Sequence, residues 1–210
     1  MYYTLICMDP PWPERGAGRI KRGADRHYDV VPVRELPGVV KDQPLYRPDP
    51  RGCLVAIWTT VSHCSRAYWL ANVLGLHYAT KLYWLKDRNF WTECGDDDCD
   101  EDFHVSGIAT MCSCGSISVK LSGELGLGQY VRHDVEELLL FRVGALPRRP
   151  RLNDRSWILA VPGRHSEKPA AMYRLLERLQ AAAGLDGPRA ELFARAARPG
   201  WDVCGNEVDK

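Results

Sequence analysis

The sequence has no apolar run of membrane-spanning length. The first apolar run, Leu5–Met8, meets an aspartate at residue 9 before any secretory signal pattern forms. No later stretch approaches the ~20 apolar residues that a membrane helix needs. We therefore expect a soluble, cytoplasmic protein with no membrane partner.

The sequence also lacks a strong net charge. Its formal charge is +1, so the chain as a whole does not attract nucleic acid. Positive charge is local instead, in the stretches 15–26 and 142–155, while an acidic run covers 96–102. Each basic stretch fits a solvated surface as well as it fits a phosphate contact.

The sequence contains eight cysteines, a number that could indicate disulfide bonds. A chain of 210 residues with 45% hydrophobic residues buries a sizeable core without disulfides, so reduced thiols or metal ligands are expected. Cys94 and Cys99 form one close pair and Cys112 and Cys114 another, within a predicted insertion at 88–122. Two such pairs resemble a structural zinc site with four thiolates, in which His104 could replace one ligand. The alternative is a redox-exposed loop with free thiols or a disulfide. The remaining cysteines stand singly in or beside apolar segments and are expected in the core: Cys7, Cys53, Cys64 and Cys204.

Strand and helix patterns alternate along the chain. Short, mostly continuous apolar runs predict strands covered on both faces, at Tyr3–Met8, Leu54–Trp58, Lys81–Leu85, Leu138–Val143, Trp157–Val161 and Ala190–Ala194. Helical spacing fills the stretch from Ser62 to Gly75 and the stretch after Pro169 up to Gly184, with each glycine as a C-terminal cap. This order predicts one α/β domain over residues 1–210, with a mostly parallel sheet and helices on both faces. Ligands of such domains collect at the carboxyl ends of the strands.

One motif follows the first predicted strand directly: Asp9-Pro10-Pro11-Trp12. Proline fixes φ and has no N–H, so the turn presents a carboxylate and carbonyl acceptors in a stiff arrangement. Such acceptors suit an exocyclic amino group, whose lone pair becomes nucleophilic when its hydrogens are drawn out of the ring plane. The indole of Trp12 offers a face on which a base can stack. An ordinary proline turn after a strand is the other interpretation.

Three segments carry a family resemblance: "MDPPW", "GRHSEKPAAMYRLLERL" and "PRAELFARAARPGWDVCGNEV". In this order they resemble the DPPW-class adenine-N6 methyltransferases, the family of the catalytic subunit of the eukaryotic messenger-RNA N6-adenosine methyltransferase. The layout is closest to stand-alone bacterial and phage members. The resemblance implies a Rossmann-like methyltransferase fold, S-adenosyl-L-methionine as methyl donor and adenine N6 as acceptor.

The resemblance also implies roles for individual residues. Asp9 and the Pro10 carbonyl would accept the hydrogens of the target amine, Pro11 would fix the turn, and Trp12 would stack on the flipped adenine. The residues expected to bind the donor are Asp9, Lys168 for its methionine carboxylate, Arg195 near its ribose, Gly205 through close backbone approach, and Asn206 with Glu207 around ribose and adenine.

Further residues are expected on the acceptor side. The stretch 13–52 is read as an irregular, substrate-side loop that carries Tyr28 near the acceptor base. Its basic side chains are expected to contact phosphates, unless the stretch is only a flexible tether: Arg15, Arg19, Lys21 and Arg22. The resemblance puts Arg132, His133 and Glu136 along the acceptor pocket, in binding or structural roles, because amino methylation needs no strong general base.

The sequence leaves the acceptor polymer open. We prefer DNA, from the likeness to stand-alone members, with the target base extruded or single-stranded. RNA is the alternative, together with cytosine-N4 methylation and a non-catalytic nucleic-acid-binding subunit, against which the intact tetrad argues. The sequence is also compatible with a homo-oligomer or with an accessory chain.

Overall fold

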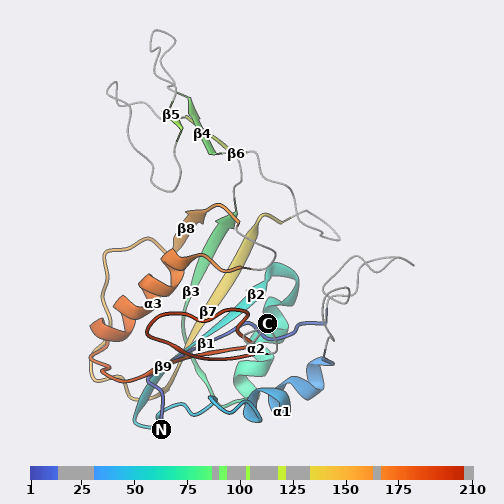
Figure 1. The fold of residues 1–210 in the computed structure, drawn as a ribbon, viewed down its shortest axis with the longest axis vertical. Helices are drawn as coiled ribbons and strands as arrows, with labels where there is room; N and C mark the ends of the chain where they lie inside the picture. The colour runs from blue at the N-terminus through green and yellow to red at the C-terminus, as the bar shows by residue number, and fades with distance from the viewer. Residues whose placement is uncertain are drawn as a thin grey trace.

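A seven-stranded sheet forms the centre of the protein (Figure 1). The computed structural model describes residues 1–13, 31–86, 90–93, 103–104, 118–121, 133–162 and 167–205. The strand order is β10-β9-β1-β2-β7-β3-β8. In chain order the strands are β1 (Leu5–Met8), β2 (Gly52–Thr60), β3 (His77–Lys86), β7 (Val135–Gly144), β8 (Trp157–Ala160), β9 (Arg189–Leu192) and β10 (Asp202–Cys204).

All strands of this sheet except β7 point the same way. β10, β9, β1 and β2 pair in parallel, β7 is antiparallel to both β2 and β3, and β3 is parallel to β8. The carboxyl ends of six strands and the amino end of β7 therefore lie at the same end of the sheet, which we call its carboxyl edge. Ligand sites of α/β sheets form at such an edge. The predicted mostly parallel α/β sheet is confirmed.

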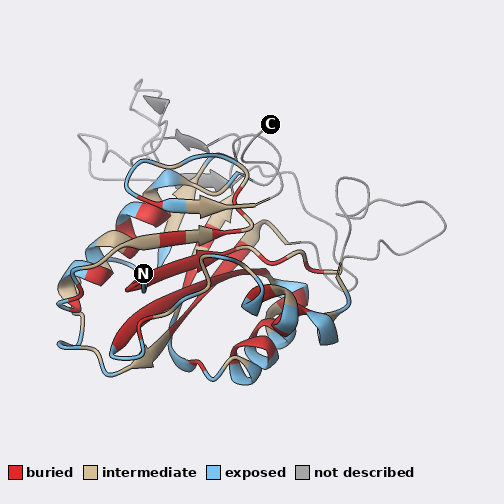
Figure 2. Cartoon of the chain, turned by 60° about the horizontal axis from the view of Figure 1, so that its bottom comes forward, coloured by how far each residue is buried: buried red, intermediate tan, exposed pale blue. Residues whose placement is uncertain are grey.

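Helices cover both faces of the sheet, with an apolar core on each side (Figure 2). Side chains alternate along β1, so Ile6 and Met8 pack toward α1 (Leu36–Lys41) and α2 (Cys64–Val73). Leu5 and Cys7 pack toward α3 (Ala170–Ala182) on the other face. Because β1 is buried on both faces, its sequence is apolar throughout. Each fully buried large aliphatic side chain contributes about 1.5–3 kcal/mol.

The predicted strands and helices are found within a few residues of their expected ends. Gly75 and Gly184 follow α2 and α3 with φ of 73° and 72°, which confirms them as left-handed caps. The single cysteines are free, with Cys7 and Cys53 buried and Cys64 and Cys204 partly buried, as expected.

Two expectations about local structure need correction. The stretch 13–52 is not irregular throughout, because it holds the turn η2 (Val33–Glu35) and the helix α1. Leu36 and Val40 of α1 are spaced four residues apart and enter the core, but six residues are too few to give a clear periodicity. Strand β10 was not predicted either, since it spans only three residues.

The predicted insertion 88–122 is described only in part. It contributes β4 (Phe90–Glu93), β5 (Phe103–His104) and β6 (Ser118–Leu121), which form an antiparallel sheet in the order β5-β4-β6. The four cysteines predicted to bind zinc lie outside the described residues.

Candidate active site at the carboxyl edge of the sheet

Strand β1 delivers Asp9 to the carboxyl edge. The strand is fully buried and ends at Met8, whereas the side chain of Asp9 is 27% exposed. The backbone N–H of Trp12 donates to the Pro10 carbonyl at 2.7 Å, which closes a tight turn around Pro11. A carbonyl oxygen has two lone pairs, so the Pro10 carbonyl keeps one beyond this bond.

A lysine joins Asp9 to the start of β7. Lys168 Nζ lies 2.9 Å from Asp9 Oδ2 and 2.9 Å from Glu136 Oε2. The other carboxylate oxygen of Glu136 accepts from Lys86, the last residue of β3. Four alternating charges thus connect three strand ends and the segment before α3. The pairing of Lys86 with Glu136 could not be read from the sequence.

Both buried members of this network are held in their charged forms. Burial alone would lower the pKa of Lys168, but the carboxylates of Asp9 and Glu136 outweigh it and raise this pKa. Burial would raise the pKa of Glu136, yet the ammonium groups of Lys168 and Lys86 lower it. These groups therefore orient charge at the edge and do not exchange protons near neutral pH.

Trp12 is more buried than its predicted role requires. Its side chain lies in the core with 6% exposure, and its indole N–H donates to the Trp58 carbonyl of β2 at 2.9 Å. The ring meets His63 edge-on at 6.1 Å between centroids, at the end of the turn η3 (Val61–His63). In this structure Trp12 anchors the proline turn to the sheet, and its stacking on a base stays a prediction.

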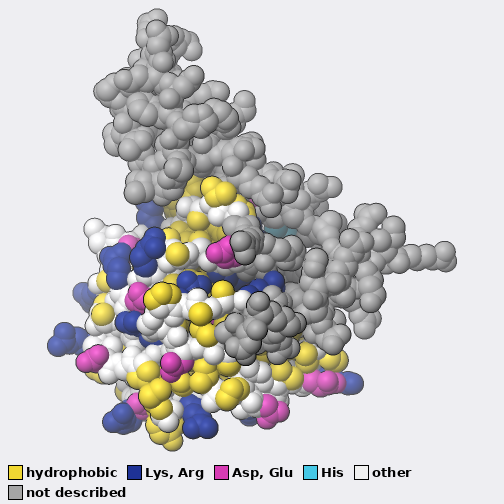
Figure 3. Space-filling view, viewed as in Figure 1, with side chains coloured by type: hydrophobic (Ala, Val, Ile, Leu, Met, Phe, Trp, Pro, Cys, Tyr) yellow, Lys and Arg dark blue, Asp and Glu magenta, His cyan; other side chains and the backbone are white. Residues whose placement is uncertain are grey.

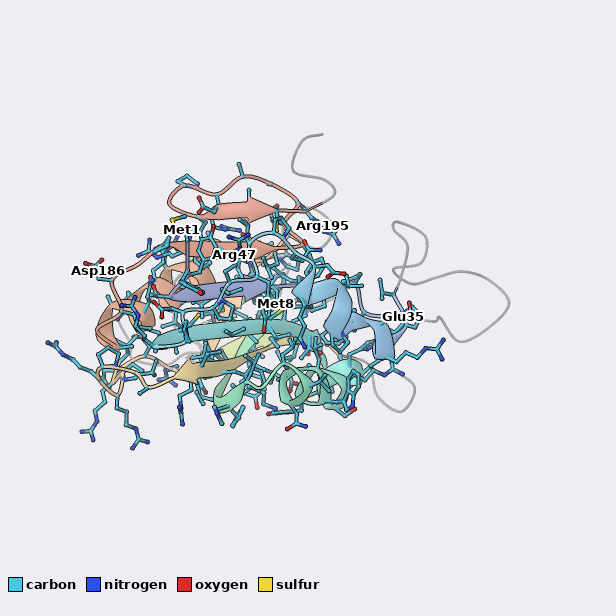
Figure 4. The ribbon with its side chains drawn as sticks, turned by 90° about the horizontal axis from the view of Figure 1, so that it is seen from below. Met1, Met8, Glu35, Arg47, Asp186 and Arg195 are labelled. Atoms are coloured by element: carbon cyan, nitrogen blue, oxygen red, sulfur yellow. The ribbon has the colours of Figure 1, made fainter. Side chains whose placement is uncertain are left out.

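The residues expected to bind the methyl donor on this side follow the carboxyl ends of β9 and β10. The Ala194 N–H donates to the Cys204 carbonyl at 2.9 Å, and a Cβ on Gly205 would lie 2.0 Å from the Ala194 carbonyl oxygen. The close approach predicted for Gly205 is thus made to the chain itself. Phe193 turns this segment with φ of 59°, an uncommon conformation for a non-glycine residue. Figure 4 shows Arg195 at the opposite end of the sheet from Asp186, which precedes β9.

A second polar cluster holds the segment after β9, and sequence reasoning missed it. Tyr173 of α3 donates its hydroxyl to Glu191 at 2.7 Å, and Arg198 Nε lies 3.0 Å from the other oxygen of that carboxylate. The Arg198 guanidinium sits 3.3 Å from the centroid of the Tyr173 ring. Burial, aided by Cys7 and Glu191, raises the pKa of the Tyr173 phenol, so it remains a donor. No spacing signal connects these residues, because they meet only through helix and strand packing.

Several predicted site residues lie outside the described residues: Arg15, Arg19, Lys21, Arg22, Tyr28, Arg132, Asn206, Glu207, Cys94, Cys99, Cys112 and Cys114. His133 is described and partly buried, two residues before β7. Across the described parts of the chain, no group of three or more His, Cys, Asp or Glu side chains could hold a metal ion. The same parts contain no helix long and apolar enough to cross a membrane.

Two comparisons with known proteins agree with the fold. The mostly parallel, seven-stranded sheet with helices on both faces is consistent with a Rossmann-like methyltransferase fold. The family model MT-A70 matches residues 119–207. The chain is 25% identical over 210 residues to the N6-methyladenosine RNA methyltransferase MTA1 of Cryphonectria parasitica, covering 99% of this chain and 52% of that protein. The chain is thus similar to MT-A70 methyltransferases, in line with the resemblance of its motifs, and it spans about half the length of this curated relative.

Proposed function

We propose that the protein transfers a methyl group from S-adenosyl-L-methionine to N6 of adenine in nucleic acid. The observation that carries this proposal is the Asp9 carboxylate, presented beside the Pro10 carbonyl at the carboxyl edge and held by Lys168 at 2.9 Å. The family-model match and the named relative support the same reaction class.

The residues at the carboxyl edge suit the binding of S-adenosyl-L-methionine. Lys168 has three N–H donors, two of which serve Asp9 and Glu136, so the third suits a methionine carboxylate. Arg195, Gly205, Asn206 and Glu207 are proposed around the ribose and adenine of the donor. When bound, S-adenosyl-L-methionine supplies an electrophilic methyl group.

The protein's own contribution is to prepare the target amine. The Asp9 carboxylate and the Pro10 carbonyl each accept one N–H of the adenine amine, which frees the nitrogen lone pair from conjugation with the ring. Lys168 fixes the direction of the Asp9 carboxylate. The carboxylate oxygen that accepts from the amine therefore does not have to reorient during methyl transfer. The proton that the amine then carries leaves to solvent. Arg132, His133 and Glu136 are proposed to line the acceptor pocket, with Trp12 and Tyr28 beside the base.

The acceptor polymer needs a direct comparison. The sequence favoured DNA, whereas the named relative is an RNA methyltransferase, which makes RNA the second candidate. Incubation with labelled S-adenosyl-L-methionine and matched DNA and RNA, single- and double-stranded, followed by nucleoside identification, tests both. We expect N6-methyladenine. A labelled N4-methylcytosine, or donor binding without transfer to any polymer, would contradict the proposal, the latter in favour of a non-catalytic subunit.

Asp9 provides the decisive variants. Asp9→Ala should abolish transfer while donor binding remains measurable. Asp9→Asn keeps one acceptor oxygen and the shape of the side chain, so it separates loss of charge from loss of the turn. Asp186→Asn is the control, because Asp186 is exposed and lies at the opposite end of the sheet from Arg195. Turnover retained in Asp9→Ala would overturn the assigned role.

We also propose a structural zinc ion held by Cys94, Cys99, Cys112 and Cys114. Four thiolates leave no open position for a catalytic water, so the ion would stabilise the insertion and not the reaction. Metal analysis of purified protein should find one equivalent of zinc, which a chelator removes with loss of stability. Zinc-free protein with unchanged unfolding in chelator would remove this proposal.

A further inference from the structure

A basic residue stands two positions before an aromatic residue both in β3 and at the start of β8. Lys81 precedes Tyr83 by two residues, and Arg155 precedes Trp157 by two residues. Parallel pairing sets Tyr83 opposite Trp157, so the two rings lie on one face of the sheet on strands about 4.8 Å apart. Arg155 Cζ lies 5.5 Å from the centroid of the Trp157 ring. Lys81 Nζ lies 5.1 Å from the centroid of the Tyr83 ring, but its charge is matched by Glu137, whose Oε1 lies 2.9 Å away.

These two aromatic rings are not part of the described cores. Leu82, Trp84 and Ile158 point toward α3, so the alternation of side chains turns Tyr83 and Trp157 to the opposite face. On that face α2 contacts β2 and β7, and neither ring belongs to the cluster beneath it. Trp157 is 40% exposed.

Arg155 lies in a basic segment of the chain that leads into β8. The segment 148–157 contains four arginines and one acid, Asp154, which Arg178 engages through two hydrogen bonds of 2.8 Å. Arg148, Arg149, Arg151 and Arg155 are exposed. Figure 3 shows Lys and Arg side chains over the side of the molecule on which α3 lies in Figure 1.

The face lies close to the candidate active site. Tyr83 is three residues before Lys86, which is about 10 Å along a strand. Lys86 contacts Glu136, the partner of Lys168 at the carboxyl edge. The charge network of the candidate site therefore begins about 10 Å beyond Tyr83 along β3.

We propose that Tyr83 and Trp157, with Arg155, form a stacking platform for a single-stranded nucleic-acid segment beside the target adenine. The proposal rests on the proposed function and names the form of its substrate. Aromatic faces stack on any base and cations meet phosphates, so the platform holds an unpaired strand with little sequence preference. A duplex hides its base faces and binds this surface more weakly.

The test uses labelled oligo(dT) and oligo(U), which contain no adenine and report the platform without methylation. Loss of one stack in Trp157→Ala should weaken binding about 5- to 100-fold, and Tyr83→Ala should act in the same direction. Trp157→Tyr should restore much of the affinity. Arg155→Ala should reduce the salt dependence of log K by about 0.7, the value of one single-strand phosphate contact. Trp69→Ala is the control, since Trp69 is 41% exposed on α2 and should leave binding unchanged.

The outcomes separate the platform from the enzyme. Unchanged oligonucleotide affinity in both Trp157→Ala and Tyr83→Ala overturns the platform, even where methyl transfer is intact. A change of oligomeric mass in Trp157→Ala with unchanged oligonucleotide affinity also overturns it, because the face is then a protein contact. Reduced affinity in these variants supports the platform even if no adenine is methylated, which would count against the proposed function alone.

Discussion

Lys168 Nζ lies 2.9 Å from Asp9 Oδ2, which ties the segment before α3 to the proline turn after β1. The lysine is almost fully buried, with 8% of its side chain exposed, so its charge depends on its carboxylate partners. Removal of one member of such a network leaves the others uncompensated in a low-dielectric environment.

Lys168→Met should therefore destabilise the protein by about 3–5 kcal/mol, because Asp9 would lose its cation and Glu136 would keep only Lys86. The free energy of unfolding in urea measures this effect, and calorimetry should show weaker donor binding. Lys41→Met, at the exposed end of α1, is the control. A free energy of unfolding identical to that of the native protein would mean that the network contributes nothing to stability.

Trp12→Phe separates anchoring from stacking. The change keeps an aromatic ring but leaves the buried Trp58 carbonyl without its donor, which should cost about 1–3 kcal/mol. The midpoint of thermal unfolding should fall, whereas Trp69→Phe at an exposed position should leave it unchanged. Full stability with a large loss of methyl transfer would show instead that Trp12 acts on the base.

The sequence predicted the fold where its physical signal was strong. Continuous apolar runs identified β1 and β2 because both faces of these strands are covered. The reversed direction of β7 was not predicted, since an apolar run reads alike in parallel and antiparallel pairing. Elements as short as α1 and β10 give no usable periodicity.

The candidate site was predicted in part for a similar reason. Asp9 follows a buried strand and is the first residue of the Asp-Pro-Pro-Trp motif. In the structure, Lys168 lies within 2.9 Å of Asp9. The ion pairs of Lys86 with Glu136 and of Arg198 with Glu191 depend on strand register and helix packing, which no local pattern encodes. The burial of Trp12 follows from its fit against β2, whereas the motif alone indicated an exposed face.

Gly205→Ala should disrupt the junction of β9 and β10. A Cβ at this position would lie 2.0 Å from the Ala194 carbonyl oxygen, so the backbone on the proposed donor side must shift. We expect a lower unfolding temperature and weaker binding of S-adenosyl-L-methionine by calorimetry. Gly38→Ala is the matched control, because nothing lies within 4 Å of its added methyl group in α1. That control should gain about 0.5–1 kcal/mol of stability. Unaltered donor affinity in Gly205→Ala would separate this junction from the donor site.

His63 should make the anchor of the proline turn sensitive to acid. Burial lowers the pKa of His63 from its ordinary value of 6.5, opposed by its contact with the Pro13 carbonyl and aided by Arg66. The ring also meets Thr60 Oγ1 at 3.2 Å and packs edge-on against Trp12. The unfolded chain therefore binds a proton at a higher pH than the folded protein does. The contribution of neutral His63 is complete above pH 6.5 and is lost as the pH falls below it.

The free energy of unfolding, measured between about pH 7.5 and about pH 5.5, should fall more steeply for the native protein than for His63→Gln. His77→Gln, at an exposed position in β3, should keep the native slope. Because the acid-sensitive ring touches both Trp12 and the Pro13 carbonyl, methyl transfer should decline over the same pH range in the native protein. Equal slopes for the native protein and His63→Gln would show that this histidine titrates alike in the folded and unfolded chains.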